Sequence, residues 1–112
     1  MRGQSLKGHL DLLLLSIVAS GPKHGYAVME ALRSASGDAF DLPEGTIYPA
    51  LNRLEREGLL GSEWSVVNGR RRKTYRLTSR GQEALADQRS GWEAFAAAVN
   101  QVVGGVPWPA TN

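Results

Sequence analysis

Four consecutive basic residues that follow an Asn68-Gly69 pair are the densest charge in the sequence. The chain of 112 residues carries a formal net charge of only +2, but the segment from Arg53 to Arg80 has eight Lys or Arg against three Glu, which is +5. Cations at this density can neutralise the phosphates of a nucleic-acid backbone. Charge alone leaves a second interpretation open, in which the run merely keeps a turn in solvent. The four residues are Arg70, Arg71, Arg72 and Lys73.

The residue types needed for catalysis or metal binding are sparse. The chain has no cysteine, which excludes disulfides, iron–sulfur clusters and cysteine nucleophiles. Its two histidines, His9 and His24, have no carboxylate at ligand spacing. We find no glycine-rich phosphate loop and no evident nucleophile–histidine–acid set. The sequence therefore predicts a protein that is not an enzyme and has neither a metal site nor a cofactor.

Trp92 belongs to an apolar seam near the C-terminus. Leu85, Trp92, Phe95, Val99 and Val102 recur at spacings of 7, 3, 4 and 3 residues, which is typical of a helix that packs against a partner helix. The simpler interpretation of Trp92 is a hydrophobic anchor in a dimer seam. In the alternative, two copies of Trp92 across a two-fold axis form a flat slot for a planar aromatic molecule.

Three helices are predicted in the first half of the chain, because apolar residues recur there at helical spacing. The first is apolar around most of its surface, as expected of a helix that is central in the core or shared between subunits. We expect Ser5 to cap this helix, and Phe40 and Leu42 to anchor a loop in the core. The predicted ranges are 6–20, 24–35 and 43–58.

A hairpin and a long helix are predicted in the second half. Asn68-Gly69 is a strong signal for a tight turn between two strands. Ser79, with Gln82 three residues later, is expected to form a capping box at the start of the helix. The predicted elements are strands over 60–67 and 74–77, a hairpin tip over 68–73 and a helix over about 80–103.

This order of elements predicts a mainly α fold with a small β-hairpin, namely a winged helix-turn-helix followed by a long C-terminal helix. The third helix is slim at its start, with Gly45, Thr46 and Ala50, so it can enter a major groove. We expect Tyr75, Leu77 and Trp64 to pack the hairpin on the core. The predicted division is a DNA-binding domain over 1–78, a dimerisation helix over 79–104 and a flexible tail over 105–112.

No membrane segment is predicted. The longest strongly apolar run, residues 12–19, is interrupted by Ser16 and is too short to span a bilayer. No signal-peptide cleavage pattern follows it. A content of 42% hydrophobic and 21% charged residues is typical of one globular domain. We therefore expect a cytoplasmic protein with no membrane partner.

Several spaced blocks of the sequence resemble, in the same order, the PadR family of bacterial transcriptional regulators. The resemblance covers about residues 5–100, and the single C-terminal helix is similar to that of short-form members. It implies a homodimeric repressor that binds a pseudo-palindromic operator in double-stranded DNA. The matching blocks are His24-Gly25-Tyr26, residues 44–55 (EGTIYPALNRLE), residues 58–60 (GLL), residues 69–78 (GRRRKTYRLT) and Gly81.

The resemblance also implies roles for individual residues. The recognition segment maps to Thr46, Tyr48, Pro49, Asn52 and Arg53, and the segment near the phosphate backbone maps to Tyr26. The wing maps to residues 70–73. Dimer contacts and the walls of an effector slot for a planar aromatic molecule map to His9, Leu12, Leu15, Ser16, Trp92, Phe95, Ala96 and Val99.

Two alternatives remain open at this point. One is a winged-helix module that docks proteins and does not bind specific DNA. A docking module has no need of a basic hairpin beside Asn52 and Arg53, so this feature favours the regulator. The other alternative is a regulator whose seam is filled by side chains and takes no small-molecule effector.

Overall fold

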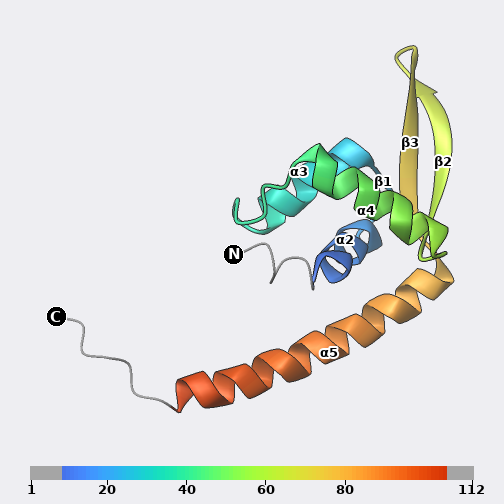
Figure 1. Cartoon of the computed structure of the whole chain (residues 1–112). Coiled ribbons are helices and arrows are strands. Elements are labelled where there is room, and N and C mark those ends of the chain that lie inside the picture. Colours follow the sequence, from blue (N-terminus) through green and yellow to red (C-terminus); the bar gives the residue numbers. More distant parts are fainter. Residues whose placement is uncertain (1–8, 106–112) are drawn as a thin grey trace.

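A shared core of leucine, isoleucine and valine side chains joins three helices to a small sheet, and a fourth helix extends beyond it (Figure 1). The computed structural model describes residues 9–105. The predicted mainly helical class with a small sheet is confirmed. The helices are α2 (Leu10–Ala19), α3 (Gly25–Ala35), α4 (Glu44–Arg56) and α5 (Ser79–Gly104), and the strands are β1 (Lys23–His24), β2 (Leu60–Val67) and β3 (Arg70–Leu77).

The core forms where the apolar faces of α2, α3 and α4 meet. Leu14 and Leu15 of α2 pack with Ile47, Leu51 and Leu54 of α4, and none of the five has exposed surface. Burying a side chain of this size contributes roughly 1.5–3 kcal/mol. This cluster fixes α4 on the body of the protein, so the exposed residues of α4 point in defined directions.

The predicted limits of the first three helices need small corrections. The third helix ends at Arg56 and not at residue 58. The second begins at Gly25, with His24 as its N-cap. The start of the first helix near residue 6 and its Ser5 cap lie outside the described residues. Phe40 and Leu42 do pack against the core, as predicted.

The sheet has the antiparallel order β1-β3-β2, in which β1 was not predicted because two residues are too short to show a strand pattern. Pairing of Val67 with Arg70 leaves only Asn68 and Gly69 in the turn, both with positive φ. This is the two-residue hairpin that Asn-Gly favours. The prediction that residues 70–73 form the tip is therefore wrong, because the strand begins at Arg70.

α5 is capped one residue earlier than predicted. The Thr78 hydroxyl accepts a hydrogen bond from the backbone N–H of Gly81 at 3.0 Å, so the capping box from Ser79 to Gln82 is wrong. A Cβ at Gly81 would lie 2.0 Å from the Leu59 carbonyl oxygen. Only glycine permits this close approach between the start of α5 and the end of the α4–β2 connection.

Most of α5 extends away from the core (Figure 1). Leu85 is the last buried residue along it. The radius of gyration is 16.8 Å, against about 13 Å for a compact domain of this length. No helix that the structure describes is long and apolar enough to cross a membrane. The division of the chain at residue 78 remains a prediction, and the predicted tail lies almost entirely outside the described residues.

Candidate functional site

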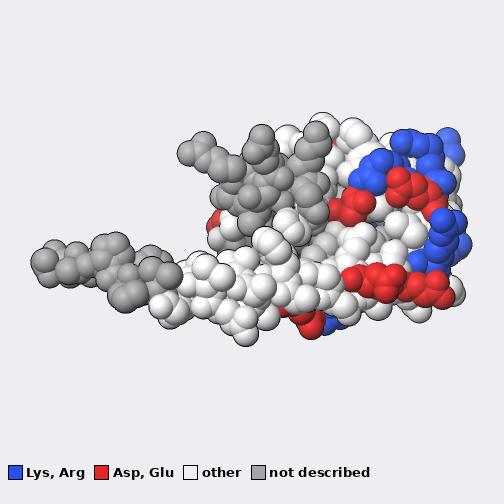
Figure 2. Space-filling model, turned by 60° about the horizontal axis from the view of Figure 1, so that its bottom comes forward, with Lys and Arg blue, Asp and Glu red and all other residues white. Residues whose placement is uncertain are grey.

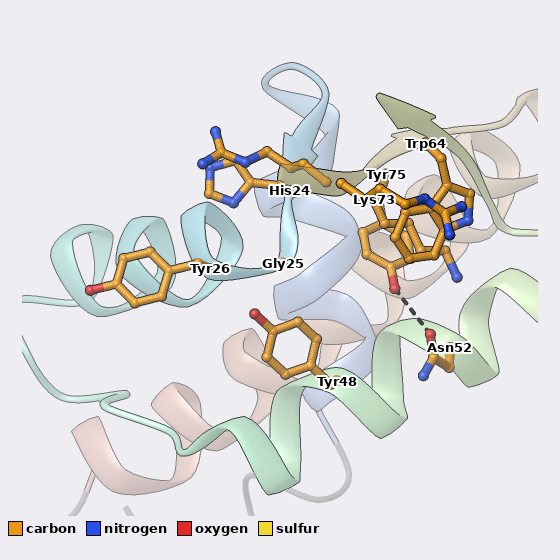
Figure 3. A pocket seen from close by; sticks show the side chains of 10 residues that line it. His24, Gly25, Tyr26, Tyr48, Asn52, Trp64, Lys73 and Tyr75 are labelled. Carbon is orange, nitrogen blue, oxygen red and sulfur yellow. Dashed lines mark hydrogen bonds between the residues drawn. The ribbon is translucent and has the colours of Figure 1, made fainter. Parts of the chain in front are cut away.

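A groove of about 430 Å³ lies between the start of α3, the outer face of α4 and the β2–β3 hairpin, which we call the wing (residues 60–77). It brings together six of the ten residues that the sequence assigned to DNA, together with four others (Figure 3). The six are Tyr26, Tyr48, Asn52, Arg71, Arg72 and Lys73, and the others are His24, Gly25, Trp64 and Tyr75.

One wall of the groove depends on a glycine. A Cβ at Gly25 would lie 2.1 Å from the Tyr48 ring, so the absence of a side chain lets the ring pack on the start of α3. Figure 3 shows this ring below Gly25, whereas Tyr26 points outward along α3. Burial is the main cause that raises the pKa of Tyr48, and Glu44 adds to it. The Tyr48 hydroxyl therefore stays protonated and can donate a hydrogen bond.

His24 closes the same wall by capping α3. Its Nδ1 accepts a hydrogen bond from the backbone N–H of Ala27 at 3.4 Å. Burial and the nearby charge of Arg72 lower the pKa of His24 below its ordinary value. The sequence assigned the contact near the phosphate backbone to Tyr26 and not to His24, although the block His24-Gly25-Tyr26 was a signal that could have placed His24 here.

The wing is held against α4 by three side-chain bonds. The Tyr75 hydroxyl donates to Oδ1 of Asn52 at 3.0 Å (Figure 3), and Nζ of Lys73 lies 2.7 Å from a carboxylate oxygen of Glu55. Ser62 also donates to Glu55. The bonds from Lys73 and Ser62 lower the pKa of Glu55, and Glu55 raises that of Lys73. These contacts fix the distance between the wing and the recognition segment.

Trp64 is exposed on the wing, contrary to the prediction that it packs on the core. Its exposed fraction is 56%, whereas Tyr75 is buried as predicted. The guanidinium of Arg71 lies 4.5 Å from the centre of the Trp64 ring system, and Nζ of Lys73 lies 5.8 Å from it. Alternation along strand β2 could have shown that Trp64 shares a face with Lys73, its partner in the β2–β3 ladder.

Figure 2 shows the charge distribution of the molecule. On the face that Figure 2 shows, Lys and Arg side chains gather, with several Asp and Glu side chains between them, at the end of the molecule that carries the wing, whereas α5 has no charged residue after Glu93. None of the described residues that line the groove is acidic. The groove therefore combines cations with aromatic rings and hydrogen-bonding groups, which suits a phosphate backbone with base edges beside it.

Arg53 does not join this groove. It pairs with Asp11 of α2, and it also lies 3.2 Å from Glu57. The bond with Asp11 is the main cause that raises the pKa of Arg53. Successive residues of a helix differ by about 100° in direction, so Asn52 faces the groove while Arg53 faces α2. Thr46 and Pro49 lie on α4 and do not line the groove either; Thr46 is partly buried and Pro49 is exposed.

Arg53 instead lines a second hollow, of about 320 Å³, which we call the α2–α5 pocket. The His9 ring meets Trp92 edge to face at a centroid distance of 5.0 Å, and Trp92 lies 6.1 Å from Phe95. The pocket thus joins an aromatic wall to a charged pair. Its lining is His9, Asp11, Leu12, Arg53, Gln88, Gly91, Trp92 and Phe95.

The remaining residues assigned to the dimer or slot lie in different surroundings. Leu15 is fully buried in the core of its own chain, so it has no surface to offer to a partner, and its assignment to the interface is wrong. Ser16 is exposed, Ala96 is partly buried, and Val99 lies in an apolar hollow farther along α5.

Within residues 9–105, no three acidic or histidine side chains come together as a metal site.

Residues 14–87 match the Transcriptional regulator PadR-like family. The chain is 39% identical over 101 residues to the transcriptional regulator Rv3488 of Mycobacterium tuberculosis (strain ATCC 25618 / H37Rv), a match that covers 90% of this chain and 89% of that protein.

Solved structures show the same fold. A transcriptional regulator from Clostridium thermocellum has a TM-score of 0.82 at 26% identity, over 88% of this chain and 97% of the other. The PadR-like transcriptional regulator of Bacillus cereus strain ATCC 14579 has a TM-score of 0.81 at 30% identity, over 93% of this chain and 100% of the other. These proteins are regulators and not enzymes, in agreement with the prediction. On these matches, this chain belongs to the PadR-like family of transcriptional regulators.

Proposed function

We propose that this protein is a sequence-specific DNA-binding regulator that acts as a homodimeric repressor in the cytoplasm. The observation that carries the proposal is the groove, where α4 and the wing are bonded to each other and face outward with cations and, among the described lining residues, no carboxylate. α4 enters the major groove, where Asn52 can contact base edges, and the wing lies on the adjacent backbone.

The dimer is supported by the exposed face of α5. Phe95, Val99, Val102 and Val103 are exposed and lie on one apolar hollow of about 310 Å³. Large apolar side chains in a contiguous patch mark an interaction surface. A second copy, packed by α5 and by the exposed part of α2, covers this face. Two-fold symmetry then presents two α4 helices to half-sites about one helical turn apart.

A small-molecule signal fits the α2–α5 pocket. Trp92 is 42% exposed beside His9 and Phe95, so a planar aromatic molecule can stack there. Arg53 lies in the same pocket and belongs to α4. A ligand that disturbs the pair of Arg53 with Asp11 would therefore act directly on the helix that contacts DNA. It can shift the dimer only by its differential affinity for two geometries.

The test is selection of host genomic fragments by the purified protein at near-physiological salt, followed by sequencing. We expect a few enriched sites with two-fold symmetry. Uniform retention that is lost at higher salt would indicate only non-specific binding to phosphates. That result would contradict sequence-specific regulation and favour the docking module.

A further inference from the structure

The four basic residues of the wing fall into two pairs, because side chains alternate between the two faces of a strand. Lys73 is paired with Trp64 in the β2–β3 ladder, and Arg71 is paired with Val66, so Arg71 and Lys73 share the face of Trp64. Arg70 and Arg72 lie on the opposite face. The run therefore does not act as one patch of equivalent charges.

On the face of the wing that carries Trp64, burial decreases from Tyr75 toward the tip. Tyr75 is buried and bonded to Asn52, and Lys73 is neutralised by Glu55. Arg71 comes next, and no carboxylate pairs with it among residues 9–105. Arg71 is thus the first cation on this face that keeps its full charge for a ligand.

Trp64 holds this cation in place. The Arg71 guanidinium lies 4.5 Å from the centre of the ring system, within the range of a cation–π interaction. A guanidinium over an aromatic ring has one side covered and keeps N–H donors free for hydrogen bonds. A guanidinium that is already oriented loses less conformational freedom when it enters a narrow site.

A narrow minor groove is the site on duplex DNA that matches such a group. A·T-rich segments have a narrow minor groove with enhanced negative potential, which attracts arginine. Its floor carries acceptors from adenine and thymine, whereas guanine adds an amino group that obstructs it. The wing lies at the side of α4, so it reaches DNA beside the segment that α4 contacts.

We propose that Trp64 is a positioning residue that orients Arg71 for insertion into the minor groove, and that this pair gives the protein a preference for A·T-rich segments flanking its site. The proposal rests on the proposed function as a DNA-binding protein. In this arrangement only Arg71 contacts the minor groove directly, and Arg70 contacts a phosphate.

The experiment compares operators that share one core and differ only in the flanks. The operator recovered by genomic selection is made with A·T flanks, with G·C flanks, and with inosine in place of guanine in the G·C flanks. Inosine lacks the guanine amino group in the minor groove but keeps the major-groove pattern of guanine. We expect the wild-type protein to bind the A·T and inosine flanks about tenfold more tightly than the G·C flanks.

Variants separate positioning from charge. Trp64→Ala keeps every charge, so we expect the preference to fall below about twofold while the slope of log K against log salt stays unchanged. Trp64→Phe, which retains a stacking surface, should keep most of the preference. Arg71→Ala should lose the preference and also lower the salt slope by about one unit. Arg70→Ala is the matched control, because it should lower the salt slope by the same amount and keep the preference.

Retention of the flank preference in Trp64→Ala would overturn the role of Trp64. A preference that inosine does not restore would overturn the minor-groove contact. Circular dichroism melting of each variant identifies one that has lost its fold, and Trp64→Phe and Arg71→Lys then carry the comparison. If the wild-type protein binds no DNA specifically, both proposals fall, whereas specific binding without any flank preference overturns this one alone.

Discussion

The groove beside the wing and the α2–α5 pocket share a wall, because α4 lies between them and contributes adjacent residues to each. Asn52 faces the groove and Arg53 faces the pocket. The lining of the groove has unbalanced positive charge, whereas the pocket pairs its one arginine with Asp11. Unbalanced charge attracts a polyanion from solution, and a satisfied pair holds two helices together. We therefore expect α4 to bind DNA on the side of the groove and to have its position controlled from the side of the α2–α5 pocket.

Replacing residues 70–73 by alanine tests the groove side most strongly. Each cation that contacts a phosphate contributes about 0.9 to the slope of log K against log salt. Because Glu55 already neutralises Lys73, we expect the slope to fall by about three units rather than four. Affinity at low salt should fall by roughly 100-fold or more. The measurement is fluorescence anisotropy of labelled operator over a salt range of about 50 to 200 mM, in which binding to phosphates is strongly salt-dependent.

Arg33→Ala is the control for that variant, since Arg33 pairs with Glu30 and Asp38 on α3 and does not line the groove. It removes one positive charge without touching the proposed surface, so its salt slope should match that of the wild-type protein. An unchanged slope in the alanine variant of the wing would show that the wing does not contact phosphate.

Trp92→Ala tests the pocket side. Trp92 contacts His9 and Phe95, so its removal takes away the centre of the aromatic wall. We expect the dissociation constant of the dimer, measured by sedimentation equilibrium, to rise roughly tenfold or more. Quenching of the planar dye proflavine by the wild-type protein should disappear in the variant.

The two readouts distinguish the interpretations of Trp92. A weaker dimer, together with no proflavine binding to the wild-type protein, would leave Trp92 as an anchor of the dimer seam and would remove the slot. An unchanged dimer and unchanged quenching in the variant would contradict both roles.

Substitutions of the adjacent residues Asn52 and Arg53 test whether one side of α4 contacts DNA and the other side does not. Asn52→Ala should lower discrimination between the operator and a sequence changed in the contacted base pairs by about tenfold, since an amide contact to a base is worth roughly 1–3 kcal/mol. Arg53→Ala should leave discrimination within about twofold of wild type and the salt slope unchanged, because its charge is held by Asp11. If the salt slope of Arg53→Ala falls by about one unit, Arg53 contacts a DNA phosphate and the proposed separation of the two sides of α4 is wrong.

The sequence predicted the elements better than the directions of their side chains. Asn68-Gly69 marked the hairpin correctly, and the two-residue turn that this pair favours already implied a strand from Arg70. Because residues 70–73 were predicted as a hairpin tip, the alternation of their side chains between the two faces of the strand was missed. Apolar spacing likewise placed the buried residues of α4, because burial leaves a periodic trace in the sequence.

The surroundings of Arg53, Trp64 and Leu15 depend on tertiary contacts, which the sequence alone does not show. Helical spacing places Asn52 and Arg53 on different sides of α4, but only the position of Asp11, 42 residues earlier, shows that Arg53 is paired. The exposure of Trp64 depends on how far the wing extends past α4. Leu15 looks like its neighbour Leu12 in a helix that is apolar on several sides, and only the packing of α4 shows which of them is buried.

The smallest expected effect concerns His24, at the edge of the groove. Its pKa is lowered by burial and by Arg72, so the folded chain binds this proton less readily than the unfolded chain, whose histidine titrates near 6.5. Where the unfolded state binds more protons, stability rises with pH. The contribution of His24 to the free energy of unfolding therefore falls as pH drops below about 6.5, and it levels off below the folded pKa. Protonation of Nδ1 would also remove the acceptor that caps α3 at Ala27.

His24→Asn isolates this effect, because asparagine caps a helix well and does not titrate. Urea unfolding of both proteins between about pH 5.5 and 7.5 should show a midpoint that declines more steeply toward acid for the wild-type protein, since the other titrating groups are common to both. Equal pH dependence would mean that His24 does not resist protonation in the folded chain. A steeper decline in the variant would mean that the folded state favours the charged ring, and His24 would then join Arg71 and Arg72 as a cation of the groove.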